Sequence, residues 1–215
     1  MADEPGPRGK FIVIEGGDGV GKSTQVGAVV KELETRGVAA IATREPGGTS
    51  LGEELRAILA SDRAISPSAE ALLISAARAQ HCAEVIKPAL AQGRWVVSDR
   101  FTGSFYAYQG YGRGIPLGEL EAMTRFATSS LVVDLEVLLV PRDGVSPYRA
   151  LDGEDRFESM GDTYHQRVAS GFAELADRLG WAVVEGSGTV SEVTARIMSE
   201  IEARFLGDTG SGEKR

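Results

Sequence analysis

The chain has 215 residues, of which 42% are hydrophobic and 25% are charged, and its formal net charge is −8. This length and composition are typical of one globular domain with a sizeable core. The acidic balance argues against a protein that coats nucleic acid or an anionic membrane, because neither surface attracts it. A phosphate site in this chain must therefore be a local cluster of cations and backbone N–H groups.

Cysteine occurs once, at Cys82, so no intramolecular disulfide can form and we expect a reducing, cytoplasmic location. The sequence around it favours a buried structural thiol. The first nine residues show no secretory signal, and the apolar runs are too short to span a bilayer. We expect one domain at 10–206 between disordered tails at 1–9 and 207–215.

Short β-branched runs alternate with longer helical patterns along this domain. The patterns predict strands at 11–14, 38–43, 95–99, 135–140 and 181–185. They predict helices at 22–36, 51–60, 67–90, 117–128, 157–179 and 190–205. Ser66 and Pro67 suit the start of the third helix, and Pro88 suggests a bend near its end. This alternation predicts an α/β fold whose parallel sheet binds ligands beyond the carboxyl ends of its strands.

A phosphate-binding loop follows the first predicted strand, where the sequence GGDGVGKS matches G-x-x-x-x-G-K-[ST]. Its glycines let successive N–H groups turn toward phosphate oxygens, and the following helix adds its positive dipole end. The residues predicted to bind ATP are Gly16, Gly17, Asp18, Gly19, Val20, Gly21, Lys22, Ser23 and Thr24. Lys22 suits the β- and γ-phosphates, and the Ser23 hydroxyl suits Mg²⁺. The N-K-x-D base-reading motif of GTPases is absent.

Charged residues also follow two other predicted strands. Asp99 closes an apolar strand in the manner of a metal-binding carboxylate, and Arg100 can donate two hydrogen bonds to a phosphate. Arg44 follows a strand and precedes a turn that begins at Pro46. The structural alternatives are a surface ion pair between Asp99 and Arg100 and a solvated arginine at position 44.

Five segments, in this order, resemble bacterial thymidylate kinases: 15–24, REPGGT at 44–49, AARAQH at 76–81, DR at 99–100 with AYQG at 107–110, and DRFE at 155–158. The similarity covers roughly residues 10–205, and REPGGT and AYQG are its most specific parts. It implies a P-loop nucleoside monophosphate kinase fold with a five-stranded parallel sheet in the order 2-3-1-4-5. It also implies transfer of the ATP γ-phosphoryl group to dTMP by a homodimer.

The resemblance also implies residue roles in an acceptor site. In this family an acid at the position of Asp18 accepts a hydrogen bond from the acceptor sugar, Arg100 holds the acceptor phosphate, and Arg78 reads the thymine edge. The other implied acceptor-site residues are Arg44, Pro46, Ile74, Ser104, Phe105, Tyr108 and Gln109. The alternatives are an acid without a ligand at Asp18, an arginine that reaches solvent at Arg78 and a core aromatic at Tyr108.

Two positions depart from the family pattern. Ile74 stands where the family usually has a phenylalanine that stacks on thymine, and Phe105 replaces a small hydroxyl residue. Ile74 offers no π-face to a base. A kinase for another monophosphate, such as dUMP or dCMP, therefore stays open as an alternative. A catalytically silent nucleotide-binding protein is a second alternative, which the intact Lys22 and Arg100 argue against.

An irregular stretch at 142–156 interrupts the strand–helix alternation and carries Arg142, Arg149 and Arg156. Loops of this length are uncommon unless they are functional. An arginine-bearing lid would meet the charge on the transferred phosphoryl group and exclude water, whereas the alternative is a solvated basic loop. Because Gly19 stands where one subtype of the family has a loop arginine, the chain resembles the lid-arginine subtype. The predicted catalytic residues are Lys22, Asp99, Arg100 and Arg149.

Overall fold

The computed structural model of the chain describes residues 8–141 and 161–207. The predicted lid at 142–156, with Arg149, and most of both predicted tails lie outside the described residues.

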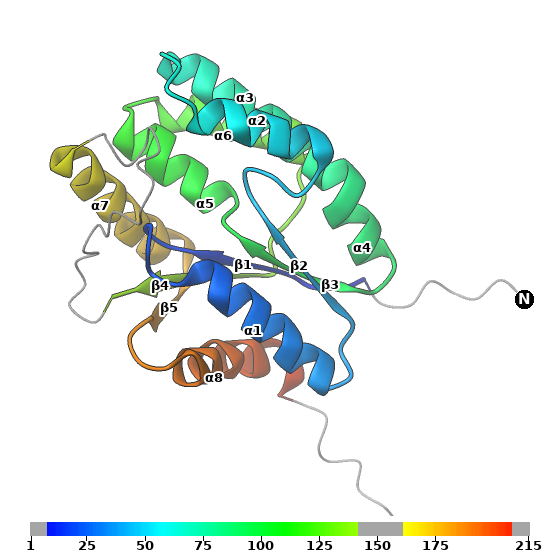
Figure 1. Cartoon of the computed structure of the whole chain (residues 1–215). Helices are drawn as coiled ribbons and strands as arrows, with labels where there is room; N and C mark the ends of the chain where they lie inside the picture. Colours follow the sequence, from blue (N-terminus) through cyan, green and yellow to red (C-terminus); the bar gives the residue numbers. More distant parts are fainter. Residues whose placement is uncertain (1–7, 142–160, 208–215) are drawn as a thin grey trace, which may run out of the picture.

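Five parallel strands form one sheet in the order β2-β3-β1-β4-β5, as the resemblance implied (Figure 1). Their bounds are β1 Phe11–Glu15, β2 Ala40–Arg44, β3 Trp95–Asp99, β4 Leu135–Val140 and β5 Ala182–Glu185. β1 is central and all five of its residues are buried, as its continuous apolar sequence predicts. Ile14 pairs with Asp99 and Glu15 with Leu138, so the ends of the three central strands lie together.

Helices cover both faces of this sheet (Figure 1). Their bounds in the described residues are α1 Lys22–Thr35, α2 Ser50–Ala60, α3 Pro67–His81, α4 Lys87–Ala91, α5 Thr102–Phe105, α6 Leu117–Thr128, α7 Asp162–Leu179 and α8 Val190–Ile201. Wider π-helical turns occupy Cys82–Ile86, Tyr106–Gly112 and Glu202–Leu206. α1 and α8 bury Val29 and Ile197 against Ile12 on one face, while the segment after α3 buries Ile86 against Val13 on the other.

The long helix predicted at 67–90 forms in three continuous pieces: α3, a π-helical turn and α4. The Ser66 side chain accepts a hydrogen bond from the Ala69 N–H, which confirms the predicted cap. Pro88 has no N–H to donate to the preceding turn, and the wider turn at Cys82–Ile86 lies just before it.

Two features differ from the predicted elements. The helix predicted from residue 157 begins at Asp162, because Gly161 lies at φ 78°, outside the helical region. A helix also runs from Thr102 to Gly112, where the sequence analysis predicted no element. The helix at 102–112 carries the AYQG segment at 107–110 and brings it against the candidate site described below.

Cys82 is buried at the sheet face, and burial raises the pKa of its thiol to about 12, which suits a structural role. Within residues 8–141 and 161–207, no helix has the length and apolar character needed to cross a membrane.

Candidate active site

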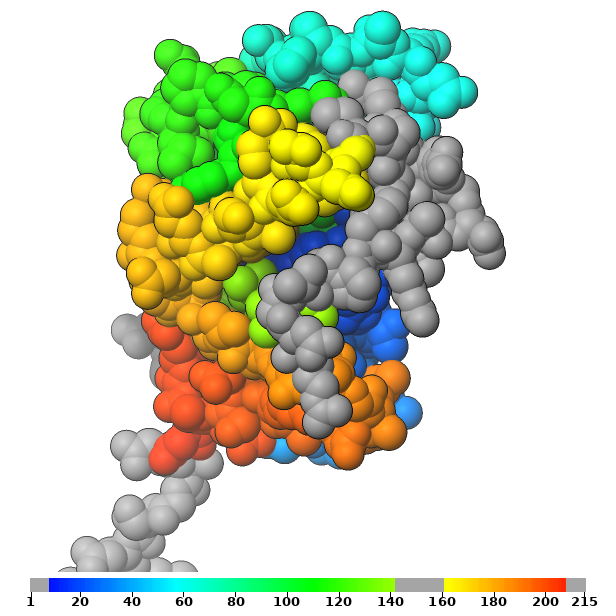
Figure 2. Space-filling model, turned by 90° about the vertical axis from the view of Figure 1, so that its left-hand side faces the viewer, coloured from blue at the N-terminus to red at the C-terminus, as the bar shows by residue number. Residues whose placement is uncertain are grey.

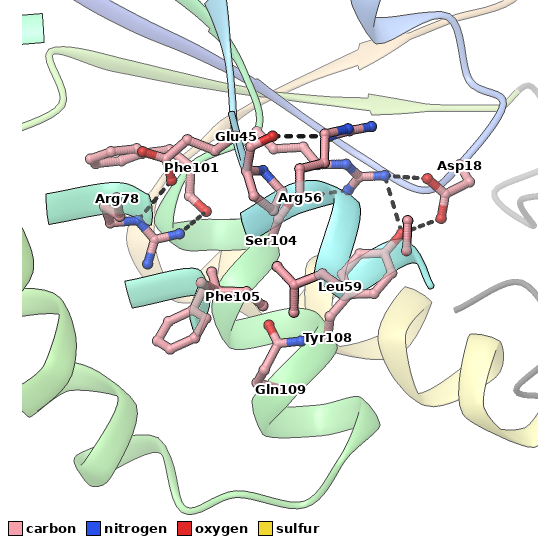
Figure 3. A pocket seen from close by; sticks show the side chains of 14 residues that line it. Asp18, Glu45, Arg56, Leu59, Arg78, Phe101, Ser104, Phe105, Tyr108 and Gln109 are labelled. Atoms are coloured by element: carbon pink, nitrogen blue, oxygen red, sulfur yellow. Dashed lines mark hydrogen bonds and ion pairs between the residues drawn. The ribbon is translucent and has the colours of Figure 1, made fainter. Parts of the chain in front are cut away.

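Two adjoining cavities open beyond the carboxyl ends of the central strands in the described part of the chain. The polar one is bordered by the phosphate loop. The second cavity lies between α2, α3 and the helix at 102–112. Figure 3 shows the side chains that line this second cavity. Asp18, Glu45, Arg56 and Arg100 border both cavities, so a group held in one can meet a group held in the other.

A second view shows the side of the molecule on which α7 lies. Figure 2 shows α7, in yellow and orange, above α8, in orange and red, with dark blue atoms of the β1–α1 region in the hollow between them.

The phosphate loop takes the backbone shape that its glycines permit. Gly16 lies at φ 142°, and a Cβ there would meet the Leu139 carbonyl oxygen at 2.7 Å. Lys22 begins α1, is 6% exposed and donates a hydrogen bond of 2.6 Å to the Gly17 carbonyl. Burial, followed by the positive charge of Arg100, lowers the pKa of Lys22 to about 8. Asp99, Asp18 and Glu15 favour the charged amine, and the oxygens of a polyphosphate at this loop would favour it further.

Ser23 and Asp99, the two predicted metal ligands, lie side by side in the lining of the polar cavity. The Ser23 hydroxyl donates a short hydrogen bond to Oδ2 of Asp99, while Oδ1 is buried with no hydrogen-bond partner among the described residues. A hydroxyl beside a carboxylate with a spare oxygen fits Mg²⁺, which prefers oxygen ligands and keeps sites for water and phosphate. No cluster of three or more His, Cys, Asp or Glu suited to a metal occurs within residues 8–141 and 161–207.

Arg100 is the link between the cavities. It lies at φ 68°, and its guanidinium donates hydrogen bonds to Gly16 O at 3.0 Å, to Ser104 Oγ at 2.9 Å and to Asp18. It also lies 5.0 Å from the centre of the Tyr108 ring. Left-handed backbone is unusual for a residue with a side chain, and here it turns the guanidinium back over the phosphate loop.

Asp18 lies where the two cavities join, and its carboxylate is charged at neutral pH. Tyr108 Oη donates to Asp18 Oδ2 at 2.7 Å, beside the ion pair with Arg100. Burial alone would raise the Asp18 pKa, but the charges of Arg100 and Lys22 outweigh it and lower the pKa to about 2. Burial raises the pKa of Tyr108. Asp18 is therefore an acceptor of hydrogen bonds, and Tyr108 a donor, at neutral pH.

Arg78 lines the second cavity and is held there by a buried network of hydrogen bonds. Its Nε donates to Glu45 at 2.8 Å and its Nη2 to the Phe101 carbonyl at 3.1 Å, and Glu45 also bonds to His81 at 3.0 Å. Nη1 of Arg78 is buried without a hydrogen-bond partner among the described residues. The sequence alternative of an arginine that reaches solvent is wrong, because Arg78 is 1% exposed. A buried, unsatisfied donor suits a carbonyl oxygen on a ligand.

The apolar wall of the second cavity contains both departures from the family pattern. Ile74 lines the cavity. Phe105 and Leu59 line it too (Figure 3). Phe105 is 1% exposed, and the Arg78 guanidinium lies 4.8 Å from the centre of its ring. The aromatic surface of this cavity thus comes from Phe101 and from the helix that follows it at 102–112, and not from α3.

Arg44 and Pro46 take different places around the site. Arg44 lines the polar cavity and pairs with Glu53 at 2.8 Å, while Pro46 lines the other cavity and its carbonyl accepts from Arg56 at 3.0 Å. Arg56, which the sequence analysis did not select, reaches both cavities from α2. The sequence around Arg56 did not mark it as a site residue, because one exposed arginine on a helix is common.

Glu15 is a further residue that the sequence analysis missed. It is fully buried at the end of β1 and accepts hydrogen bonds from the backbone N–H of Phe101 at 2.9 Å and of Ser104 at 3.0 Å, and from the Ser104 hydroxyl. Burial raises its pKa, and burial together with Glu15 raises the pKa of Glu136 to about 8. Glu15 anchors the turn that carries Arg100, and Ser104 has its proton committed to Glu15.

Most of the predicted site residues lie around these two cavities. The polar cavity is lined by Asp18, Gly19, Gly21, Lys22, Ser23, Thr24, Arg44, Asp99 and Arg100. Asp18 and Arg100 also line the other cavity, with Pro46, Ile74, Arg78, Ser104, Phe105, Tyr108 and Gln109. Gly16, Gly17 and Val20 are not part of either lining, although the Gly16 and Gly17 carbonyls accept from Arg100 and Lys22. Arg149 lies outside the described residues.

A phosphate loop on a five-stranded parallel sheet, with a second cavity that shares an arginine with it, defines a P-loop phosphotransferase. Comparison with known proteins gives the family. The family model described as thymidylate kinase matches residues 14–197. The chain therefore belongs to the thymidylate kinase family.

Individual relatives agree over nearly the whole chain. It is 41% identical to the thymidylate kinase of Synechococcus sp. strain CC9605 over 203 residues, which cover 90% of this chain and 97% of that protein. It is 40% identical to that of Nitrosomonas europaea, with 97% and 99% covered. The crystal structure of thymidylate kinase from Ehrlichia chaffeensis has a TM-score of 0.75 at 28% identity, with 91% of this chain and 100% of that chain covered.

Proposed function

We propose that this chain transfers the γ-phosphoryl group of ATP to dTMP, which gives ADP and dTDP. The observation that carries the proposal is the position of Arg100, which borders both cavities and reaches the phosphate loop. ATP lies on the phosphate loop. The acceptor lies in the second cavity, between α2 and α3, which is called the acceptor cavity below. Family membership supports a nucleoside monophosphate kinase. The alternatives of another acceptor and of a catalytically silent binding protein are not favoured.

In this mechanism an oxygen of the acceptor phosphate attacks the γ-phosphorus in line. Lys22 and Arg100 hold the two phosphate groups together and meet the charge that spreads over the transferred group. Asp18 accepts a hydrogen bond from the acceptor sugar hydroxyl. Nη1 of Arg78, which has no hydrogen-bond partner among the described residues, donates to a base carbonyl. No general base is required, because a phosphate dianion is already a nucleophile.

Mg²⁺ is part of this proposal. Ser23 and Asp99 would hold it, since they supply a hydroxyl and a carboxylate with a spare buried oxygen. The ion would neutralise charge between the β- and γ-phosphates.

The remaining parts of the proposal follow from the sequence. We assign residues 10–206 to one kinase domain and residues 142–156 to a lid. Arg149, in this lid, contacts the transferred phosphoryl group. The lid arginine would complement Lys22 and Arg100 while the lid excludes water. The single buried thiol and the substrates suit a cytoplasmic enzyme.

The test is ADP release from Mg²⁺-ATP with five acceptors: dTMP, dUMP, dCMP, UMP and AMP. We expect kcat/KM to be highest with dTMP, because Arg78 and the apolar wall suit a pyrimidine with a carbonyl and a methyl group. Turnover of another monophosphate without dTMP would keep the kinase but reject the acceptor. ATP and dTMP binding with no ADP release in any arm would favour the binding protein.

We also propose a homodimer, formed by the helices α2, α3 and α6, which pack side by side (Figure 1). Each exposes a large apolar side chain: Leu51 is 43% exposed, Leu72 57% and Phe126 88%. Apolar side chains exposed on three adjoining helices suit burial against a second copy.

Light scattering after size exclusion tests this assembly. We expect twice the monomer mass for the wild-type protein and the monomer mass for Leu72→Glu with Phe126→Glu, since charges would be buried in the interface. Leu179→Glu, at a side chain 51% exposed on α7, is the matched control that keeps the dimer. A monomeric wild-type protein at micromolar concentration would reject the proposal.

A further inference from the structure

Gln109 lines the acceptor cavity from the helix at 102–112, and its side-chain amide is held from behind. Nε2 of Gln109 donates a hydrogen bond of 3.0 Å to Oε1 of Glu70, which belongs to the first turn of α3. Glu70 is fully buried and Gln109 is 2% exposed. In Figure 3 the Gln109 amide points into the space between Phe105 and Leu59, with its oxygen on the side of Phe105.

The partner of Glu70 settles which way this amide faces. Arg113 donates to Oε1 of Glu70 at 3.1 Å and to Oε2 at 2.6 Å, in a forked ion pair. An ionised carboxylate only accepts hydrogen bonds, so the group of Gln109 that faces Glu70 must be its NH₂. The usual ambiguity between the oxygen and nitrogen of a glutamine is thus removed by chemistry. The Gln109 oxygen is the atom left for the cavity.

We propose that Glu70 and Arg113 are positioning residues that fix Gln109 with its oxygen toward the acceptor base, so that the cavity selects a base edge with an N–H. This inference rests on the proposed function, since it concerns the same acceptor cavity. Glu70, Arg113 and Gln109 then determine which pyrimidine base the acceptor cavity prefers. Phe105 provides no hydroxyl for the base in this chain.

The cavity then presents a donor and an acceptor from opposite elements. Arg78, on α3, offers a buried N–H without a hydrogen-bond partner among the described residues, and Gln109 offers an oxygen. Thymine and uracil carry a carbonyl next to an N–H on their pairing edge, which complements this pair. Cytosine carries an amino group next to an unprotonated nitrogen, which opposes both.

The test compares dTMP with dCMP in the wild-type protein, Glu70→Gln, Gln109→Met and the double variant. Dissociation constants by calorimetry and kcat/KM are both measured. We expect each single variant to lower the dTMP-to-dCMP ratio about tenfold, the effect of one hydrogen bond. With Gln at position 70 the Gln109 amide can turn round, and with Met at position 109 the acceptor is lost.

The double variant separates positioning from general damage. Because Glu70 acts through Gln109, the double variant should lower the ratio about tenfold and not a hundredfold. A purely structural role would weaken both pyrimidines equally and would raise the KM for ATP as well. Gln109→Met leaves the Glu70–Arg113 pair intact, so it tests the same step if Glu70→Gln does not fold.

The outcomes also separate this inference from the proposed function. Ratios within twofold of wild type in Glu70→Gln and Gln109→Met overturn the positioning role even if dTMP is phosphorylated. Binding of dTMP without phosphoryl transfer overturns the proposed function, and the ratio of dissociation constants still tests the positioning role. A wild-type protein that binds neither pyrimidine overturns both.

Discussion

Replacement of Arg100 by alanine is expected to lower kcat/KM for the acceptor about 10³-fold, as for other arginines that meet a transferred phosphoryl group. Arg100 contacts the phosphate loop, Asp18 and Ser104 from one guanidinium, so its removal takes a cation from the point where the cavities join. It also leaves the Asp18 carboxylate beside the acceptor phosphate without its counter-charge. The measurement is steady-state kinetics with dTMP varied at saturating Mg²⁺-ATP.

A surface arginine provides the control for Arg100. Arg36 pairs with Glu32 and Glu202 at the end of α1, away from both cavities, so Arg36→Ala should keep wild-type kinetics. Arg100→Lys keeps the charge but loses the fork, and should recover only part of the rate. A loss below tenfold in Arg100→Ala would contradict its place at the junction.

Replacement of Lys22 by methionine is expected to lower kcat about 10³-fold, since the preorganised cation at the β- and γ-phosphates is lost. Methionine keeps much of the length and packing of the buried stem, so the fold should survive. Thermal unfolding checks this point, and a variant with a wild-type melting curve and wild-type kcat would contradict the role of Lys22.

The pKa of Lys22 gives this residue a second signature. In the protein without nucleotide, burial lowers this pKa to about 8, so the amine is mostly neutral at pH 8.5. Phosphate oxygens favour the charged form and raise the pKa again, so ATP binding at pH 8.5 takes up a proton. Calorimetry in two buffers of different protonation enthalpy should show this uptake in the wild-type protein. Lys22→Met should abolish it, and equal uptake in both proteins would contradict the assignment.

The sheet, the phosphate loop and the order of elements could be predicted because their signals are local. An apolar run, a glycine pattern and a helix start lie next to one another around Lys22. The helix at 102–112 was missed because Gly103, Gly110 and Gly112 interrupt its pattern. These glycines serve close packing: a Cβ at Gly110 would lie 2.7 Å from Leu117, and one at Gly112 would lie 2.5 Å from Tyr164. Such contacts exist only in the folded chain.

Three glutamates of the site, Glu15, Glu45 and Glu70, could not be predicted for a related reason. Glu45 meets Arg78 from 33 residues away, and Glu15 meets Ser104 from 89 residues away. In the sequence each is an ordinary charged residue, and only the β-strand register and the course of α3 bring it to its partner. The resemblance gave Asp18 and the cationic residues of the site, while the glutamates that orient the neighbouring side chains, including Glu70, came from the fold.

The central claim is that a phosphoryl group passes from ATP at the phosphate loop to dTMP in the second cavity. The amounts of each phosphorus-containing product formed with dTMP test this claim most directly. Phosphorus NMR of the protein with Mg²⁺-ATP and dTMP should show one dTDP formed for each ADP and no inorganic phosphate. ADP that appears with inorganic phosphate while dTMP stays unchanged would show that water is the acceptor, and this would contradict the account.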